Sequence, residues 1–204
     1  IYIGNDFHEN DYLYLNNKDK TFTESIKNSM SHTSHFTMGV DVADLNQDGS
    51  LDVFTTDMMP YDPKIFLKSG GEDLDKISRI KKDLGFEQQF SRNHMQISRG
   101  NNTFSEVAIQ TNTHATDWSW GVLLQDFDSD GRDDIFISNG ILKRPNDLDY
   151  INYLSNVDFT EYNNSRQDVI KKKLIDKMPT LKIPNLFFKN NGNLNFEKVN
   201  PSFT

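Results

Sequence analysis

DVADLNQDGSLDVF (residues 41–54) and LLQDFDSDGRDDIF (residues 123–136) place acidic or amide side chains on alternate positions around a single glycine. Each stretch then runs into a short series of β-branched and aromatic residues, which favour a β-strand. The glycine predicts a sharp bend with positive φ. The two stretches therefore predict acidic loops that lead directly into strands.

The acidic loops belong to an internal repeat, which is the first feature to look for because it determines the fold. Residues 36–57 align without a gap on residues 118–139, with Gly39 at the position of Gly121. Residues 1–5 (IYIGN) match the strand that follows each acidic loop. We therefore expect a third acidic loop immediately before residue 1.

A predicted hairpin also recurs. In each copy an apolar pair leads through a polar turn to a phenylalanine, over residues 13–22, 95–104 and 187–196. Asn, Gly and Asp in the turns are typical of β-hairpins. A glutamate follows closely after each phenylalanine, and its recurrence predicts a structural role. These glutamates are Glu24, Glu106 and Glu197.

Each full unit supplies four strands: one before the acidic loop, one after it, and two in the hairpin. Four-stranded units in series are typical of β-propeller blades. The sequence therefore predicts an all-β fold, a partial β-propeller of about two and three-quarter four-stranded blades. We expect one domain over residues 1–204. The expected blade parts are residues 1–30, 31–110 and 111–204.

Two helical insertions interrupt the repeat, at about residues 60–92 and 143–184. Apolar residues of the first recur near helical spacing, at Leu74, Ile77, Ile80 and Leu84. In the second, Ser165 and Asp168 have the spacing of a capping box. Insertions in repeat proteins gather on one face, often the binding face, so these segments are candidates for contact with a partner.

The acidic loops are candidate calcium sites, because Ca²⁺ takes six to eight oxygen ligands. The candidate ligands of the first loop are Asp44, Asn46, Asp48, the carbonyl of Ser50, and Asp52. Those of the second loop are Asp126, Asp128, Asp130, the carbonyl of Arg132, and Asp134. Without a cation, carboxylates about 4 Å apart repel by roughly 4 kcal/mol per pair at an effective dielectric near 20. The sequence thus predicts two bound Ca²⁺ ions.

Other readings of the loops fit less well. An EF-hand needs Glu at its twelfth position, where this chain has Thr55 and Ile137, and it needs a helix on each side. Magnesium keeps several of its waters and demands stricter geometry. The second loop has four carboxylates where the first has three and an amide. From this count we expect tighter binding at the second loop.

Composition excludes several classes of protein. The net charge is −8, and no Lys/Arg cluster is strong enough to follow a phosphate backbone, so nucleic acid is not an expected partner. Cysteine is absent, which excludes disulfides and thiolate sites. No apolar run reaches the roughly 18 residues that span a bilayer. We therefore expect a protein without a membrane-spanning segment.

The remaining candidates have plain structural readings. Trp118 and Trp120 could stack on a sugar, but they align with Phe36 and Met38, which favours core packing. His32 and His35 have a spacing that suits zinc, yet no third ligand is evident nearby. The other histidines, His8, His94 and His114, are scattered. No nucleophile elbow, catalytic triad or phosphate loop is visible, so we do not expect an enzyme.

These loops and their flanking strands resemble the FG-GAP/VCBS repeats of integrin-like β-propellers. TDWSWG (116–121), NDFHENDYLYLNN (5–17) and FFKNNG (187–192) are similar to segments of bacterial secreted proteins that often carry an ASPIC/UnbV domain. The resemblance implies seven blades, with Ca²⁺ in the loop that joins the first two strands of a blade. It therefore implies that further blades of the parent protein, or another chain, complete the ring.

The resemblance also implies a location and a role. We expect a non-catalytic calcium-binding module for binding or assembly, outside the cell or on the outer membrane of a gram-negative bacterium. Extracellular calcium modules bind with dissociation constants of roughly 10⁻⁴ to 10⁻³ M, which cytosolic calcium would not fill. Two alternatives remain open: part of a glycan-active enzyme with its site near the insertions, and docking of an outer-membrane protein complex by those helices.

Overall fold

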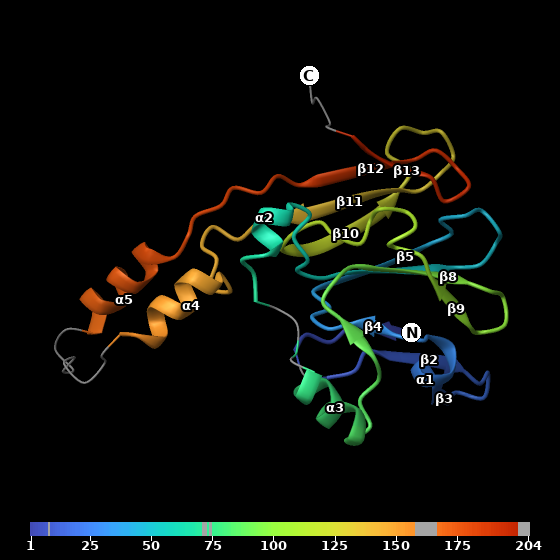
Figure 1. Cartoon of the computed structure of the whole chain (residues 1–204). Helices are drawn as coiled ribbons and strands as arrows, with labels where there is room; N and C mark the ends of the chain where they lie inside the picture. The colour runs from blue at the N-terminus through green and yellow to red at the C-terminus, as the bar shows by residue number, and fades with distance from the viewer. Residues whose placement is uncertain (8, 71–72, 74, 158–166, 200–204) are drawn as a thin grey trace.

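A computed structural model describes the chain except residues 8, 71–72, 74, 158–166 and 200–204. His8, Leu74 and Ser165, which entered the sequence predictions, therefore lie outside the described residues. The rest is mostly β, with three antiparallel sheets stacked face to face and a short parallel pair of strands (Figure 1). Within the described residues the three sheets form a stack and not a closed ring.

The outermost sheet at the N-terminus has three strands. They are β1 (Tyr2–Ile3), β2 (Tyr12–Asn16) and β3 (Phe22–Glu24), in that order across the sheet. The short helix α1 (Ile26–Ser29) follows β3 and contacts β2. This sheet has the strand of residues 1–5 and the first hairpin side by side, as the repeat predicts.

The other two antiparallel sheets have four strands each. The middle sheet contains β5 (Gly39–Ala43), β6 (Asp52–Thr56), β8 (His94–Ser98) and β9 (Phe104–Glu106). The third contains β10 (Ser119–Gln125), β11 (Asp134–Asn139), β12 (Leu186–Asn190) and β13 (Phe196–Val199). In both, an acidic loop joins the first two strands and a hairpin supplies the last two, which is the predicted strand pattern.

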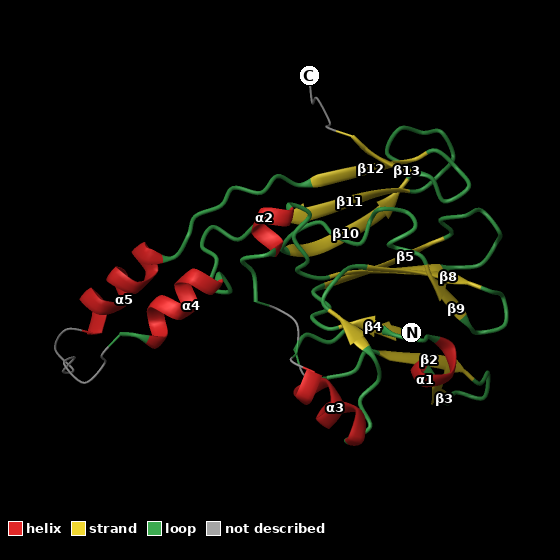
Figure 2. Cartoon of the chain, viewed as in Figure 1, coloured by secondary structure: helices red, strands yellow, loops and turns green. Residues whose placement is uncertain are grey.

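The other helices lie, in sequence, between the second and third strands of these two sheets. The first pair is α2 (Pro63–Phe66) and α3 (Asp75–Asp83), and the second pair is α4 (Leu148–Ser155) and α5 (Gln167–Lys177). They project from the ends of the sheets opposite the acidic loops (Figure 2). None of the helices in the described part of the chain is long and apolar enough to span a membrane. The parallel pair is β4 (Thr33–Ser34) and β7 (Gln89–Phe90).

The main core lies between the middle and third sheets. Phe54 and Met95 are paired across β6 and β8, and both are fully buried there. Ile135 and Ile137 of β11 reach the same core from the third sheet. A second, smaller core, which includes Val53, lies between the middle sheet and the N-terminal sheet. The middle sheet is therefore covered on both faces.

The third sheet has an open apolar face on its other side. Leu123, Phe136 and Phe187 form one row across β10, β11 and β12 on that face. In the repeat, Phe136 stands at the position of Phe54, and Phe187 at that of Met95. Leu123 is 55% exposed and the two phenylalanines are half-buried. Phe54 and Met95 are fully buried between the middle and third sheets, whereas the equivalent residues of the third sheet are thus only partly covered.

Gly39 is where the first strands of neighbouring sheets meet. A Cβ atom at Gly39 would lie 2.8 Å from the Cα of Gly121, closer than real Cβ contacts. Asp41 adds a direct bond between the sheets, because its Oδ2 accepts a hydrogen bond of 2.8 Å from the backbone N–H of Leu124. The glycine that recurs in the repeat is therefore required at this position by a close approach of two backbones.

One hydrogen bond recurs in all three sheets. In each sheet, a backbone N–H at or just beyond the end of the strand that precedes the hairpin donates to a side-chain oxygen just before the hairpin. The pairs are Asn5 with Asp11 (2.8 Å), Asp57 with Asn93 (2.8 Å) and Asn139 with Asn185 (2.9 Å). The bond between Asp57 and Asn93 is buried, and there an N–H without a partner would be costly; in each sheet the acceptor stands just before the hairpin.

Asp57 differs from its counterparts Asn5 and Asn139 in being an acid. Its carboxylate is fully buried and accepts hydrogen bonds from Ser34 Oγ and from the backbone N–H groups of residues 35, 36 and 58. Burial raises the pKa of Asp57 to about 7, although the hydrogen bonds oppose that rise. Below a pH of about 7, the folded protein therefore keeps a proton on Asp57, which the unfolded chain releases near the ordinary pKa of an aspartate.

The unequal burial of Phe54 and Phe136 predicts unequal costs of truncation. Phe54→Ala should lower the free energy of unfolding by about 3–5 kcal/mol, because it leaves a cavity between two sheets. Phe136→Ala should cost roughly half of that or less, because its ring already faces solvent in part. Urea denaturation of the two variants measures both values. Equal losses would contradict the open face of the third sheet.

The raised pKa of Asp57 predicts a dependence of stability on pH. The stability that this group provides is fully present below the unfolded pKa, near 4, and is lost as the pH rises through about 7. Over roughly three pH units, at about 1.4 kcal/mol each, the loss approaches about 4 kcal/mol. Asp57→Asn, the residue of the other two repeats, should remove this slope between pH 4 and pH 7. Parallel slopes for the two proteins in urea denaturation would contradict the assignment.

Candidate metal centre

The two acidic loops have the same backbone conformation. Gly49 and Gly131 both have a φ of 85°, which confirms the positive φ that the sequence predicts. Gln47 and Ser129 also have positive φ, of 60° and 62°. No pattern in the sequence predicts this second position of positive φ, since neither residue type requires it. The shared geometry makes the loops equivalent sites.

In the first loop, the aspartates accept hydrogen bonds from the loop's own backbone. Asp44 accepts from the N–H groups of Asp48 (3.0 Å) and Gly49 (2.8 Å). Asp48 accepts from the N–H of Ser50 (2.8 Å) and from Asn46 Nδ2 (2.9 Å). These hydrogen bonds, that from Asn46 first, lower the pKa of Asp48. The candidate ligands are thus held in place on a preformed turn.

The second loop repeats this network and gathers its carboxylates more closely. Asp126 accepts from the N–H groups of Asp130 (3.0 Å) and Gly131 (2.8 Å), and Asp130 accepts from the N–H of Arg132 (3.1 Å). One oxygen each of Asp126, Asp128 and Asp130 lies within 4.8 Å of the other two. Within the described residues, the first loop brings no three carboxylates this close, because its middle position is an amide.

The last aspartate of each loop is built into the sheet. Asp52 and Asp134 are fully buried, and each accepts one backbone hydrogen bond from its loop and one from the third strand of its sheet. Asp52 accepts from Leu45 (3.0 Å) and Ser98 (2.8 Å). Asp134 accepts from Phe127 (3.4 Å) and Asn190 (2.8 Å). Burial raises the pKa of both carboxyls. These two predicted ligands therefore also hold the loop to the hairpin.

Cationic side chains of the protein itself reach the second loop. Lys189 Nζ contacts Asp128 and lies 3.1 Å from Asp130. Arg132 Nη2 lies 2.6 Å from Asp130, while its Nε donates to the carbonyl of Asn190. The repeat position of Lys189 in the middle sheet is occupied by Ile97. The count of carboxylates alone, from which the sequence predicts tighter binding here, did not include these internal cations.

The loops also contact each other. Gln47 Nε2 in the first loop donates to the carbonyl of Gly131 in the second, at 2.8 Å. Asn190 Nδ2 donates to the carbonyl of Leu45, at 3.0 Å. Both loops lie at the same end of the stacked sheets (Figure 1). A cation bound in one loop would therefore stabilise the contact between two sheets as well as its own turn.

The donor set of these loops fits calcium. All the candidate ligands offer oxygen, which hard cations such as Ca²⁺ prefer. The ammonium group of Lys189 between Asp128 and Asp130 marks a position where positive charge is already favoured. Ser50 and Arg132, the predicted carbonyl ligands, each direct their N–H back to the preceding aspartate of the row. Their assignment as calcium ligands stays a prediction.

The structure separates the histidines of the candidate zinc pair. His35 is buried, with Nδ1 3.2 Å from Ser91 Oγ and Nε2 2.8 Å from Lys81 Nζ. His32 Nε2 instead lies 3.4 Å from Glu106 Oε2. No sequence signal joins His32 to Glu106, because they are brought together only when the segment before β4 packs on the middle sheet.

The tryptophan prediction is wrong for one of the two residues. Trp118 is half-buried, but Trp120 is 52% exposed, and its Nε1 donates to the carbonyl of Gly140. The two rings are 6.5 Å apart. The expectation of core packing rested on alignment with Phe36 and Met38, which lie at a junction of two sheets. The equivalent position on the third sheet has no described sheet beside it.

The recurrent glutamates are structural in two of three cases. Glu24 Oε1 accepts from the N–H groups of Leu13 and Ile26, and Glu106 Oε1 accepts in the same way from Met95 and Ala108. The bonds from Leu13 and Met95 join the two strands of a hairpin, and those from Ile26 and Ala108 hold the chain just after it. Glu197 stands one residue closer to its phenylalanine, is exposed, and accepts only from the Asn191 side chain. The prediction is confirmed for Glu24 and Glu106.

The two kinds of aspartate in the first loop predict different variant effects. With calcium removed by chelator, Asp52→Ala should lower the free energy of unfolding by about 2–4 kcal/mol, because it leaves two buried backbone N–H groups without a partner. Asp48→Ala should leave stability nearly unchanged under the same conditions, because its bonds are exposed to water. Thermal and urea denaturation in chelator measure both. A large loss for Asp48→Ala in chelator would contradict this division.

Comparison with known proteins agrees with this geometry. Residues 1–55 and residues 81–137 each match the sequence model described as FG-GAP-like repeat. Together the two segments make up more than half of the chain, and each ends within the strand that follows an acidic loop. A search of curated proteins gave no match. The chain therefore belongs to the FG-GAP-like repeat family.

Proposed function

We propose that this chain is part of a calcium-stabilised β-propeller module that binds or assembles with partners and carries out no catalysis. The observation that carries the proposal is the pair of equivalent loops at one end of adjacent sheets, each with a row of oxygen ligands. FG-GAP-like repeats form modules that are generally non-catalytic. One Ca²⁺ ion in each loop would offset the repulsion among carboxylates and stabilise the contact between the sheets.

The open face of the third sheet supports the propeller part of the proposal. Leu123, Phe136 and Phe187 lie on the outer face of the third sheet, whereas the corresponding face of the middle sheet is buried. Phe127 packs edge-on against both phenylalanines, with its ring centroid 6.5 Å from that of Phe136 and 5.4 Å from that of Phe187. A connected aromatic surface of this kind marks an interface. Its occupant is a further four-stranded sheet, supplied by the parent protein or by another chain.

A cavity at the opposite end of the sheets is the place proposed for a partner. It has a volume of about 510 Å³ and lies among α2, α4 and the end of α5. Its lining includes Lys64, Lys68, Tyr150, Tyr153 and Lys177. Lysines beside tyrosine rings suit an acidic glycan or an acidic loop of a surface protein.

The acids of that cavity favour binding over hydrolysis. Glycoside hydrolysis needs two carboxyl groups that are free to exchange protons with the substrate. Asp147 accepts the capping hydrogen bond from Tyr150 N at the start of α4, and Asp149 forms an ion pair of 2.8 Å with Lys68. Because both acids of the lining are engaged, we propose a binding site here in preference to a glycan-active enzyme.

The proposed location is extracellular, at the surface of a bacterial cell. FG-GAP-like repeats are typically found in extracellular domains. Loops of this exposure suit dissociation constants of roughly 10⁻⁴ to 10⁻³ M, which only extracellular calcium would fill. The resemblance of TDWSWG and its companions to bacterial secreted proteins supports an outer-membrane protein complex as the partner.

Calcium should raise the melting temperature of the chain, and chelator should lower it again. Binding to the native state alone adds RT ln(1 + [Ca²⁺]/Kd) to the free energy of unfolding, so the effect grows with calcium concentration. Asp48→Ala together with Asp128→Ala should abolish the rise. Melting curves followed by circular dichroism measure it, and identical curves with calcium and with chelator would rule out the proposal.

Lys189→Met gives the matched control for the second loop. Removing the ammonium group takes away a competing cation, so the calcium-induced rise in melting temperature should become larger than in the original chain. Lys182→Met, at an exposed position away from the loops, should leave the rise unchanged. A smaller rise for Lys189→Met would mean that the lysine supports the ion instead of competing with it.

A further inference from the structure

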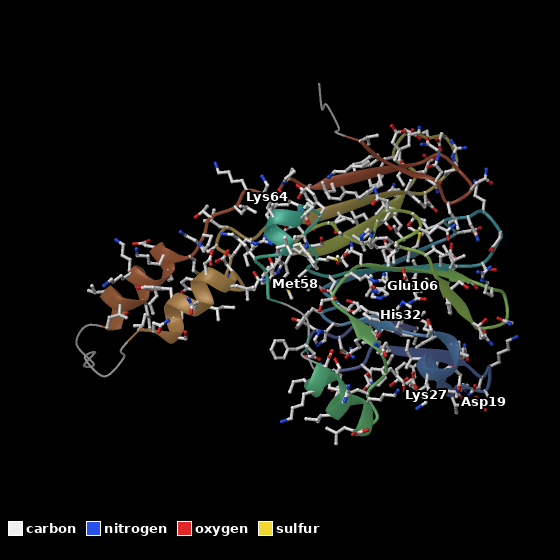
Figure 3. All side chains as sticks on the ribbon, viewed as in Figure 1. Asp19, Lys27, His32, Met58, Lys64 and Glu106 are labelled. Atoms are coloured by element: carbon white, nitrogen blue, oxygen red, sulfur yellow. The ribbon has the colours of Figure 1, made fainter. Side chains whose placement is uncertain are left out.

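A second group of possible ligands lies away from the acidic loops, beside the join between the middle and N-terminal sheets. It consists of His32, His94 and Glu106, each with one ligand atom within 4.8 Å of the other two. Figure 3 shows His32 and Glu106 next to each other inside the stack of sheets. His94 begins β8, Glu106 ends β9, and His32 immediately precedes β4.

Rigid elements hold these residues in place. His94 and Gln96 lie on the same face of β8, and Glu106 pairs with Gln96 across β9. Gln96 Nε2 donates to the backbone carbonyl of His32 at 2.8 Å, which ties the incoming segment to that face. A site whose members sit on paired strands keeps its geometry without a bound ion.

Hydrogen bonds around the group direct the correct atoms inward. His32 Nδ1 lies 2.8 Å from Ser31 Oγ, so the other ring nitrogen, Nε2, faces Glu106 Oε2. Glu106 uses Oε1 for the backbone N–H groups of Met95 and Ala108, which leaves Oε2 for the group. Metal-binding histidines commonly have the second ring nitrogen fixed by an outer partner in this way.

His94 is the feature that the fold alone leaves unexplained. It is fully buried, and neither ring nitrogen has a hydrogen-bond partner among the described residues. The Arg92 carbonyl lies near the ring without hydrogen-bond geometry. The repeat places Tyr12 and Leu186 at the same position, so the sheet does not require a histidine there. Burial, followed by the Arg92 guanidinium, lowers the pKa of His94 to about 3, so the ring is neutral and able to bind a metal.

We propose that His32, His94 and Glu106 form a binding site for Zn²⁺, separate from the acidic loops. Two imidazole nitrogens and one carboxylate oxygen are a ligand set that zinc takes up readily, with one position left for water or a bound group. Calcium would not compete, because it prefers oxygen ligands. The side chain of His32 is 21% exposed, which gives an ion access from solvent.

Arg92 sets the affinity of this site. Its Nη2 lies 2.6 Å from Glu106 Oε2 and 3.1 Å from His32 Nε2, so the guanidinium bonds to two of the three ligands. Arg92 makes no hydrogen bond to His94, so the ion pair with Glu106 does not explain why a histidine is buried at that position. Zinc must displace the guanidinium from these two atoms. Arg92 thus acts as an internal competitor, as Lys189 does in the second acidic loop.

Calorimetric titration of Zn²⁺ into the chelator-stripped full chain, in an excess of calcium, tests the proposal. We expect one zinc ion per chain. His94→Leu introduces the residue of the third repeat and should weaken zinc binding more than about tenfold. Even the loss of a residue that only supports a metal ligand reduces affinity by about that much. Arg92→Met should tighten it. Asp130→Asn, in the acidic loop, should leave the zinc affinity unchanged.

The same titration can overturn the proposal. Absence of zinc binding by the original chain would do so, even if Arg92→Met binds the ion. An unchanged zinc affinity for His94→Leu would also do so, because it would place the ion elsewhere. If His94→Leu does not fold by circular dichroism, His32→Gln takes its place, since the side chain of His32 is partly exposed. Substitution by Co²⁺ then reports nitrogen and oxygen ligation through its visible spectrum.

Discussion

Buried side-chain oxygens that accept backbone N–H groups are the constraint on which this structure depends. At the loop end of the sheets, Asp52 and Asp134 tie each acidic loop to the third strand of its sheet. At the other end, the buried Asn93 accepts the backbone N–H of Asp57, which follows the second strand of the middle sheet. Because leaving these bonds unmade would strand buried or partly buried donors, they hold the hairpin in register with the first two strands. The sheets then stack through their apolar rows.

The molecule handles concentrated negative charge in two ways. The exposed aspartates of the acidic loops lie in water, where repulsion is moderate and a cation can enter and leave. The Glu106 side chain is nearly buried, where an unpaired carboxylate would be costly, and the Arg92 guanidinium lies 2.6 Å from it. In the second acidic loop, Lys189 likewise pairs with the carboxylates. The second acidic loop and Glu106 thus share one feature, a cation that the chain itself supplies.

Departures from the repeat identify the residues with individual roles. Asp57 stands where the other units have asparagine, His94 where they have tyrosine or leucine, and Lys189 where the middle sheet has Ile97. The Asp57 carboxyl, whose pKa is raised by burial, accepts hydrogen bonds in a buried turn; Lys189 contacts an acidic loop, and His94 lies beside Glu106 without a hydrogen bond. The shared positions account for the fold, and these departures account for its sites.

The sequence by itself determined the repeat, its strands, the bends at Gly49 and Gly131, and the membership of each acidic loop, because all of these are local. Alternation, turn residues and ligand spacing act over a few neighbouring residues. Only the tertiary structure brought Lys189 to Asp128, left Trp120 exposed, and joined His32 to His94 and Glu106. These contacts connect residues tens of positions apart, and they depend on how one sheet packs on the next. Local patterns carry no record of that packing, since the same apolar row can face a neighbouring sheet or open solvent.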